Sequence, residues 1–306
     1  MRPMADPPRL PDIALPDGAE IAEVLRRVPG KRAIFAGSWQ GRDAIFRLAE
    51  AGTADTQARE WDEARRIWPY MQGARFRVAE PLAYLPDLRL MVMERAPGTP
   101  LLSHLWSVAP SERSAALTPA VQWLRRYTEV SEGWQMAAPE GWRARAARCA
   151  GAQVFSDLRE IEGGILAALD ALLPAMAGTE WRVAICHGDF HPNNLLRDGA
   201  RLTGIDTGGS ARMPVCKDIA RFLMHLARRG MIPSGQMWCG VDAALVARFS
   251  EVFALTEAER RVVLPFFLGI EALLRVETHA LKPRRVHQAA TVYRALLADL
   301  ARLARP

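Results

Sequence analysis

The N-terminal third of the chain alternates short apolar runs with turn residues, a pattern typical of antiparallel strands. Residues 32–35 and 43–48 are separated by the glycine-containing segment 37–41, which indicates a hairpin. A second hairpin is expected from residues 81–84 and 89–93, because a proline and an aspartate stand between them as a turn. The pattern therefore predicts a small antiparallel sheet near the N-terminus.

Apolar residues three or four positions apart, the spacing of one helix face, dominate the rest of the chain. The same spacing occurs twice near the N-terminus, at residues 19–27, with Ile21, Val24 and Leu25, and at residues 56–69. Before these, residues 1–17 carry five prolines and are expected to form an extended lead-in. Further helices are expected at 118–127, 142–151, 155–173, 218–229, 241–253, 257–277 and 287–303.

The stretch from Ala184 to Leu196 joins two apolar runs through a polar loop, which favours a strand–loop–strand arrangement. Asp189 and Asn194 lie five positions apart in this loop, the spacing of the protein-kinase catalytic loop. A carboxylate there can accept the proton of an attacking hydroxyl, and an amide oxygen five residues later can reach a phosphate-bound magnesium. Asp206 follows a second apolar run and can supply a carboxylate ligand to the same metal.

These residues resemble the aminoglycoside phosphotransferase/choline kinase family of small-molecule kinases. Its hallmark, H-G-D-x-x-x-x-N followed by I-D-x-G, is present as His187-Gly188-Asp189 with Asn194 and as Ile205-Asp206-Thr207-Gly208. The resemblance also implies an aspartate opening the next helix, and Asp218-Ile219-Ala220 fits. It implies a bilobal, protein-kinase-like α+β fold with a nucleotide-binding sheet lobe at 18–96 and a helical lobe at 97–306.

The resemblance further implies which residues hold the nucleotide. Gly30 and Lys31 stand where the family places a loop over the phosphates. Arg47 occupies the strand position of the phosphate-binding lysine. Glu60 matches the helix glutamate that pairs with this lysine, although it could instead be a solvated surface glutamate. Arginine is a planar, permanently charged fork, so its replacement of lysine is not neutral.

Two more positions take their roles from the resemblance. Glu94 and Ala96 lie in a segment similar to the hinge between the lobes, where backbone groups bind adenine. His191 has two open roles, facing the transferring phosphoryl group or making a hydrogen bond within the turn. Asp189 and His191 are therefore the catalytic candidates, and Asn194 and Asp206 the candidates for metal binding.

Two other hypotheses compete with this interpretation. His187-x-Asp189-x-His191 also resembles part of a metallophosphoesterase site, but the chain lacks the Gly-Asn-His that would complete one. The second hypothesis is a catalytically weak or silent nucleotide-binding homologue, which Arg47 motivates and the presence of Asp189, Asn194 and Asp206 argues against.

Composition excludes several classes of protein. Half of the 306 residues are hydrophobic and 24% are charged, which excludes global disorder. No apolar run approaches the roughly 18 residues of a membrane span, and no apolar leader starts the chain, so a cytoplasmic protein is expected. The four cysteines, Cys149, Cys186, Cys216 and Cys239, form no C-x-x-C pair and are expected to be reduced.

The formal charge of +6 does not indicate nucleic-acid binding. Almost all of the 40 basic residues are arginines, and they are scattered rather than gathered into a long basic block. We expect ATP, Mg²⁺ and a small hydroxyl-bearing acceptor as the partners of a monomer or weak homodimer.

The acceptor itself stays open at this point. A polycationic aminoglycoside requires clustered carboxylates, whereas a choline-like ligand requires an aromatic box. Sugars and amino alcohols also remain possible acceptors. The carboxylate candidates are Glu251, Glu257, Glu259, Glu271 and Glu277, interleaved with arginines, and the aromatic candidates are Trp238, Phe266 and Phe267.

Overall fold

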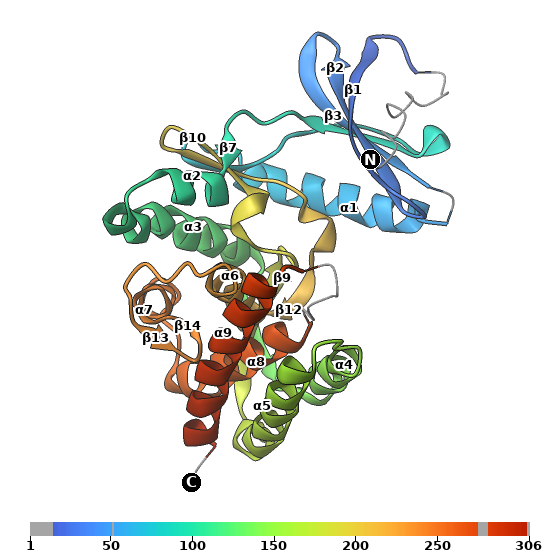
Figure 1. Cartoon of the computed structure of the whole chain (residues 1–306). Helices are drawn as coiled ribbons and strands as arrows, with labels where there is room; N and C mark the ends of the chain where they lie inside the picture. Colours follow the sequence, from blue (N-terminus) through green and yellow to red (C-terminus); the bar gives the residue numbers. More distant parts are fainter. Residues whose placement is uncertain (1–14, 51, 275–280, 305–306) are drawn as a thin grey trace, which may run out of the picture. The chain divides into compact units, whose positions relative to one another are not determined.

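The computed structural model describes residues 15–50, 52–274 and 281–304, and Figure 1 labels their helices and strands. The chain folds as two units. The first runs to Thr99 and also includes Leu196–Ser210, and the second comprises Pro100–Leu195 and the chain from Ala211 onward. Most of the lead-in expected at 1–17 lies outside the described residues.

The first unit is built on a five-stranded antiparallel sheet in the order β1-β2-β3-β6-β5. Both expected hairpins are present in it, so the predicted N-terminal sheet is confirmed. Its strands are β1 (Ala19–Val28), β2 (Arg32–Trp39), β3 (Arg42–Ala49), β5 (Pro81–Leu85) and β6 (Leu90–Glu94).

The helix expected at residues 19–27 is wrong, because this segment is strand β1. Its pairing with β2 shifts register between Ile21 and Glu23 and again between Val24 and Arg26. Each β-bulge adds one residue to the strand, so the partly buried positions recur at intervals longer than two. This irregular spacing imitates one face of a helix.

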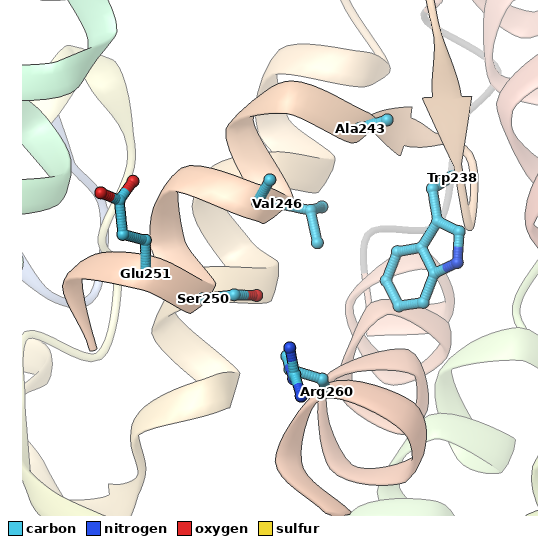
Figure 2. A pocket seen from close by; sticks show the side chains of 7 residues that line it. Trp238, Ala243, Val246, Ser250, Glu251 and Arg260 are labelled. Atoms are coloured by element: carbon cyan, nitrogen blue, oxygen red, sulfur yellow. The ribbon is translucent and has the colours of Figure 1, made fainter. Parts of the chain in front are cut away.

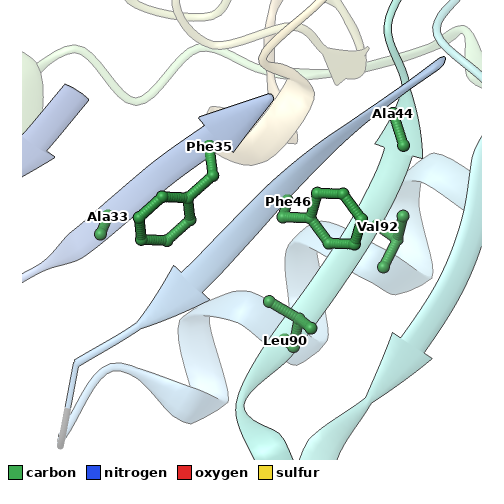
Figure 3. Close-up of a cluster of buried hydrophobic side chains, with 6 residues drawn as sticks. All are labelled: Ala33, Phe35, Ala44, Phe46, Leu90 and Val92. Atoms are coloured by element: carbon green, nitrogen blue, oxygen red, sulfur yellow. The ribbon is translucent and has the colours of Figure 1, made fainter. Parts of the chain in front are cut away.

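Alternation along the strands gives the sheet two different faces. Phe35 pairs with Phe46, and Phe46 pairs with Val92, in a fully buried cluster (Figure 3). Arg47 follows Phe46 and therefore projects to the opposite face, where Gln57 of helix α1 (Ala54–Ile67) donates a hydrogen bond to its carbonyl at 2.7 Å. The apolar face stabilises the sheet, and the other face carries the charged chemistry.

The second unit is mainly helical, and the predicted α+β class is confirmed. Helix α8 is buried all round and packs against α4, α5 and α6, while α9 packs on α5. The expected helix 257–277 is a π-helical turn, Glu259–Val263, followed by α8, and its last three residues lie outside the described residues. The helices are α2 (Leu101–Ser107), α3 (Arg113–Thr128), α4 (Glu140–Ala150), α5 (Ser156–Met176), α6 (Val215–Ala227), α7 (Ala243–Val252), α8 (Leu264–Leu274) and α9 (Pro283–Leu303).

Short strands carry the loops that hold the motif residues. The second unit contains a three-stranded antiparallel sheet in the order β12-β9-β8, and β11 runs parallel to β4 in a further small sheet. The H-G-D stretch therefore leaves the end of β9, and Asp206 follows the end of β11. These strands are β4 (Phe76–Val78), β8 (Gly133–Met136), β9 (Glu180–Cys186), β10 (Leu195–Asp198), β11 (Arg201–Gly204) and β12 (Ala211–Pro214).

All four cysteines lie in the described part of the chain and are free thiols. Burial raises the pKa of the Cys186 and Cys216 thiols well above their ordinary value, so both stay protonated at neutral pH. Within residues 15–50, 52–274 and 281–304, no helix has the length and apolar character needed to cross a membrane.

Candidate active site

Asp189 lies in the loop between β9 and β10 with its carboxylate 42% exposed. Its Oδ1 accepts a hydrogen bond from Arg221 Nε at 2.9 Å, and its Oδ2 lies 3.4 Å from His191 Nε2. Partial burial opposes ionisation, but the hydrogen bond from His191 and the charge of Arg221 outweigh burial and hold the pKa of Asp189 well below its usual range. The carboxylate is therefore ionised and accessible, the state in which it can accept a proton.

Side chains of α6 and α8 fix the backbone of this loop. Asp218, fully buried in the first turn of α6, accepts hydrogen bonds from the Gly188 N–H at 3.1 and 3.2 Å. Lys217 Nζ donates to the Gly188 carbonyl and lies 3.7 Å from carboxylate oxygens of Asp218 and Glu271. Because Gly188 precedes Asp189, these contacts orient the catalytic candidate through its backbone.

His187 braces the same loop from the core. It is fully buried, and its ring centroid lies 6.0 Å from that of Trp123 and 6.1 Å from those of Tyr127 and Phe190. Among the described residues, no group of three or more His, Cys, Asp and Glu side chains is placed to hold a metal ion. A histidine enclosed by aromatic rings does not fit the ligand role that the metallophosphoesterase hypothesis requires of it.

Asn194 and His191 lie on the same loop as Asp189. Asn194 Nδ2 donates to the Asp189 carbonyl at 3.0 Å, which directs the amide and leaves its oxygen for another partner. The His191 ring stacks on His225 of α6 with centroids 4.5 Å apart. Burial, followed by the charge of Arg229, lowers the pKa of His225, so this imidazole is neutral at physiological pH.

The first unit holds a separate cluster of four charged side chains. Arg47 Nη2 lies 2.9 Å from Glu60 Oε2 and 3.1 Å from Asp206 Oδ1. Arg32 Nη1 lies 3.4 Å from Glu60 Oε1, and its Nη2 lies 3.7 Å from Asp206 Oδ2. The structure thus brings the predicted residues Arg47, Glu60 and Asp206 together and adds Arg32, which the sequence did not indicate.

Burial differs across this cluster. Arg47 and Glu60 are each only 8% exposed, whereas the Asp206 side chain is 40% exposed. Asp206 adopts a left-handed backbone conformation, with φ 59° and ψ 49°, which aspartate tolerates better than most residues. The buried pair forms the base of the cluster, and the accessible Asp206 carboxylate can meet a ligand.

Gly208, two residues after Asp206, lets this turn approach α1. A Cβ on Gly208 would lie 2.3 Å from the Glu60 carboxyl carbon. We therefore expect Gly208→Ala to displace Glu60 from its ion pairs and to destabilise the fold by about 1–3 kcal/mol. The midpoint of thermal unfolding, followed by circular dichroism, measures this change.

Gly163→Ala is the matched control, because a Cβ at that position of α5 meets nothing within 4 Å. Alanine favours a helix interior over glycine, so this variant should unfold at the same temperature or higher. Equal midpoints for Gly208→Ala and the wild type would show that the turn accommodates a side chain.

Gly30 and Lys31 lie in the turn between β1 and β2, and both are exposed. The Gly30 N–H donates to the Glu50 carboxylate at 2.8 Å. Lys31 lines a cavity of about 30 Å³ together with Arg32, Arg47 and Glu60. Three basic side chains and one carboxylate border this cavity, so its lining carries a net positive charge.

Glu94 is the last residue of β6, and Ala96 lies two residues beyond it. The Glu94 N–H donates to the Glu80 carbonyl at 2.8 Å, and the Arg95 N–H donates to the Asp43 carbonyl at 3.0 Å. Among the hydrogen bonds of the described residues, none uses the Ala96 N–H. Ala96 therefore keeps the backbone donor that binding of an adenine edge requires.

Two of the predicted residues carry oxygen atoms of the kind that Mg²⁺ prefers. They are Asp206 of the first unit, with a carboxylate, and Asn194 of the second unit, with an amide oxygen. Magnesium sites in nucleotide enzymes commonly use one or two carboxylates and complete their coordination with phosphate oxygens and water. Arg47 contacts Asp206 Oδ1, so a metal ion bound by Asp206 would share this carboxylate with the guanidinium.

A model of the family described as "Phosphotransferase enzyme family" matches residues 26–233, more than half of the chain. The chain belongs to this family. The matched span includes the Asp189 loop, the Arg47 cluster and α6. No curated protein matches the chain.

Solved structures of other phosphotransferases share the fold. One is a thermostable variant of aminoglycoside phosphotransferase APH(4)-Ia in ternary complex with AMP-PNP and hygromycin B, with a TM-score of 0.55, 16% identity, and coverage of 92% of this chain and 94% of that one. Another is the choline kinase LicA from Streptococcus pneumoniae, with a TM-score of 0.52, 12% identity, and coverage of 92% and 94%. A third is the amicoumacin kinase hAmiN in complex with AMP-PNP, Ca²⁺ and Ami, with a TM-score of 0.50, 14% identity, and coverage of 90% and 88%. The family resemblance and the kinase-like fold predicted from the sequence are confirmed.

Sequence reasoning missed three residues that contact the predicted site residues. Arg221 and His225 stand three and seven positions after Asp218 on α6, so helical spacing could have placed them on the side of Asp218 that meets the catalytic loop. Arg32 had no such signal, because its contacts depend on how strand β2, helix α1 and the Asp206 turn meet.

The structure does not assemble the aromatic box considered for a choline-like acceptor. Phe266 and Phe267 are fully buried in α8. Trp238 instead borders a groove of about 510 Å³ beside Val246 of α7 and Arg260 (Figure 2). A single indole beside a guanidinium does not make a cage for a quaternary ammonium group.

The carboxylates considered for an aminoglycoside are also dispersed. Glu259 and Glu271 are fully buried, whereas Glu251 and Glu257 lie on the surface and pair with arginines at 2.8 and 3.0 Å. Glu277 lies outside the described residues. The described members of this set therefore form no common acidic pocket.

Proposed function

We propose that the protein transfers the γ-phosphoryl group of ATP to a hydroxyl group of a small molecule. The observation that carries this proposal is the half-exposed, ionised Asp189 on a loop whose backbone is held by Asp218 and Lys217. Membership of the phosphotransferase family supports it. A screen for ADP formation from ATP with pooled alcohols, sugars and antibiotics tests it.

In the proposed reaction Asp189 orients the acceptor hydroxyl and receives its proton. The hydroxyl oxygen bonds to the γ-phosphorus, the bond from that phosphorus to the β–γ bridging oxygen breaks, and ADP leaves. A carboxylate of depressed pKa is a weak base, but phosphoryl transfer has a loose transition state in which positioning matters more than base strength. Arg221 and His191 hold the two carboxylate oxygens in place.

Magnesium, when bound, neutralises phosphate charge and aligns the γ-phosphoryl group. Asp206 and Asn194 are its proposed ligands. On the first unit, Arg47 grips phosphate oxygens and Glu60 fixes the direction of its guanidinium, while Gly30 and Lys31 cover the phosphates. Glu94 and Ala96 are proposed to bind adenine through their backbone carbonyl and N–H.

If Arg47 grips phosphate, Arg47→Ala should weaken ATP and ADP binding by roughly ten- to a hundred-fold and leave adenosine binding close to wild type. The loss reflects one charge-assisted hydrogen bond. Calorimetric titration with the three ligands measures it. Equal ATP affinity in the variant and the wild type would show that Arg47 does not face the nucleotide, and Lys31 would become the leading phosphate anchor.

One observation favours the second candidate function, a silent nucleotide-binding homologue. Two guanidinium groups, from Arg47 and Arg32, face the carboxylate of the proposed metal ligand Asp206. Arg47→Lys separates the two candidates, because a lysine is the usual residue at this strand position in kinases. Unchanged or raised turnover in this variant is expected for an enzyme of ordinary kinase geometry, and turnover in the wild type alone for an enzyme whose pocket is shaped around the guanidinium. The silent homologue should show no turnover in either protein.

A further inference from the structure

One face of α6 and the turn after it lead away from the catalytic loop. Arg221 and His225 stand four positions apart on α6, about 6 Å along the helix axis, and Arg229 lies four positions further on, in the turn after α6 ends at Ala227. These three residues form a stripe. Arg221 contacts Asp189, so this stripe begins at the proposed base.

Two contacts connect His225 to its surroundings. His225 stacks on His191 of the catalytic loop, and Arg229 Nη1 donates to the His225 carbonyl at 3.0 Å. Only 5% of His225 is exposed, yet its Nε2 has no hydrogen-bond partner among the described residues. A buried polar atom of this kind is normally satisfied, so it indicates a partner such as a ligand or a water.

The charge around Arg229 is positive. Burial, followed by the charges of Arg228, Arg285 and Arg221, lowers the pKa of the Arg229 guanidinium to about 10, so it remains protonated at neutral pH. Arg285 belongs to the first turn of α9, and Gln288 one turn later donates to the Ala227 carbonyl at the end of α6 at 3.4 Å. Arg285 of α9 and the arginines that follow α6 are thus near one another.

A structural explanation accounts for only part of this arrangement. A cation at a helix C-terminus interacts favourably with the helix dipole, and Arg228 and Arg229 follow the end of α6. Arg285 lies near the start of α9, where the dipole disfavours a cation. Arg285 is exposed, so solvent screens its charge and the helix dipole effect on it is small. Neither dipole accounts for the unsatisfied Nε2 of the buried His225, whereas a ligand with an anionic group accounts for both this atom and the nearby arginines.

We propose that the acceptor carries an anionic group, a phosphate or a carboxylate, which Arg229 binds while its hydroxyl lies at Asp189. This inference deepens the proposed function and depends on it. Neutral His225 lies between the two arginines of the stripe and can hydrogen-bond the body of the acceptor. The reaction joins the hydroxyl oxygen to the γ-phosphorus, breaks that phosphorus' bond to the bridging oxygen, releases ADP and leaves the anionic group unchanged.

The test measures binding and transfer separately. The full chain is saturated with AMP-PNP and Mg²⁺ and titrated by calorimetry with glycerol 3-phosphate, gluconate, glycerol and kanamycin. We expect one or both anionic probes to bind more tightly than glycerol. Arg229→Gln should weaken the binding of that probe roughly ten- to a hundred-fold, and Arg229→Lys should restore part of it.

Arg261→Gln is the matched control, since Arg261 is 71% exposed and pairs with Glu257 on the surface. It should bind the anionic probe like the wild type. Preferential binding of kanamycin, failure of both anionic probes to bind, or equal affinity in Arg229→Gln and the wild type would each overturn the inference.

The same probes and ATP are then tested for transfer. With an anionic acceptor, Arg229→Gln should raise KM and leave kcat close to wild type, because Arg229 lies away from the reacting atoms. An anionic probe could bind through Arg229 and still receive no phosphate. If, in addition, no compound of the pooled screen received phosphate, the proposed function would be wrong, but the anion site would still be supported.

Discussion

Asp189→Asn is expected to lower kcat by about two to four orders of magnitude and to leave ATP affinity close to wild type. Asparagine keeps the shape of the side chain but cannot accept the acceptor proton. Its neutral amide also loses the charge that pairs with Arg221 and His191. Steady-state ADP formation measures the first effect, and calorimetric titration with AMP-PNP measures the second.

Asp198→Asn provides the control for this prediction. Asp198 is an exposed carboxylate at the end of β10, and its loss should change neither kcat nor the affinity for AMP-PNP. Near-normal turnover in Asp189→Asn would contradict the assignment of Asp189 as the base. A large loss of nucleotide affinity would instead place Asp189 among the nucleotide ligands.

Asp206→Ala is expected to abolish the strengthening of nucleotide binding by Mg²⁺ and to remove turnover. The variant lacks the half-exposed carboxylate that follows β11 and that Mg²⁺ would use together with phosphate oxygens. Comparing AMP-PNP affinity with and without Mg²⁺, in the variant and the wild type, measures the effect directly.

The left-handed backbone of Asp206 requires a second variant, because alanine tolerates this conformation less well than aspartate. Asp206→Asn keeps a residue suited to it and removes only the charge. In Asp206→Ala and in Asp206→Asn, AMP-PNP binding should lose most of its dependence on Mg²⁺, and the circular dichroism spectrum should stay that of the wild type. The same magnesium dependence in Asp206→Asn and the wild type would identify another residue as the ligand.

Features encoded by local spacing could be predicted from the sequence. The two hairpins were indicated by turn residues between apolar runs, and most helices by apolar residues recurring on one face. The spacing of Asp189, Asn194 and Asp206 carried the family resemblance that the match over residues 26–233 confirms. These signals depend on neighbours along the chain, which is why a single sequence suffices.

Features that depend on tertiary contacts could not be predicted in this way. Bulges in β1 gave residues 19–27 a helix-like spacing, and only the pairing with β2 shows that the segment is a strand. Arg32 contacts Glu60 and Asp206 from strand β2, whereas Arg47 contacts them from strand β3. Nothing in the local sequence of Arg32 distinguishes it from the other arginines.

The acceptor candidates failed for a related reason. Phe266 and Phe267 belong to a helix that is buried on every side, because it packs against α4, α5, α6 and α9. Local sequence shows that a residue is aromatic but not whether its ring reaches a ligand. The four-residue spacing of Arg221, His225 and Arg229 is present in the sequence, but only the contacts with the catalytic loop relate these residues to Asp189.

The most direct test of the central claim is to follow the γ-phosphoryl group itself. The wild-type chain and Asp189→Asn are incubated with ATP labelled at the γ-phosphate, Mg²⁺ and the pooled hydroxyl compounds, and the label is traced by chromatography and mass spectrometry. We predict that the wild type moves the label to a small molecule as a phosphate ester and that the variant does so far more slowly. Label that stays in ATP, or that appears only as inorganic phosphate at equal rates in both proteins, would contradict the account.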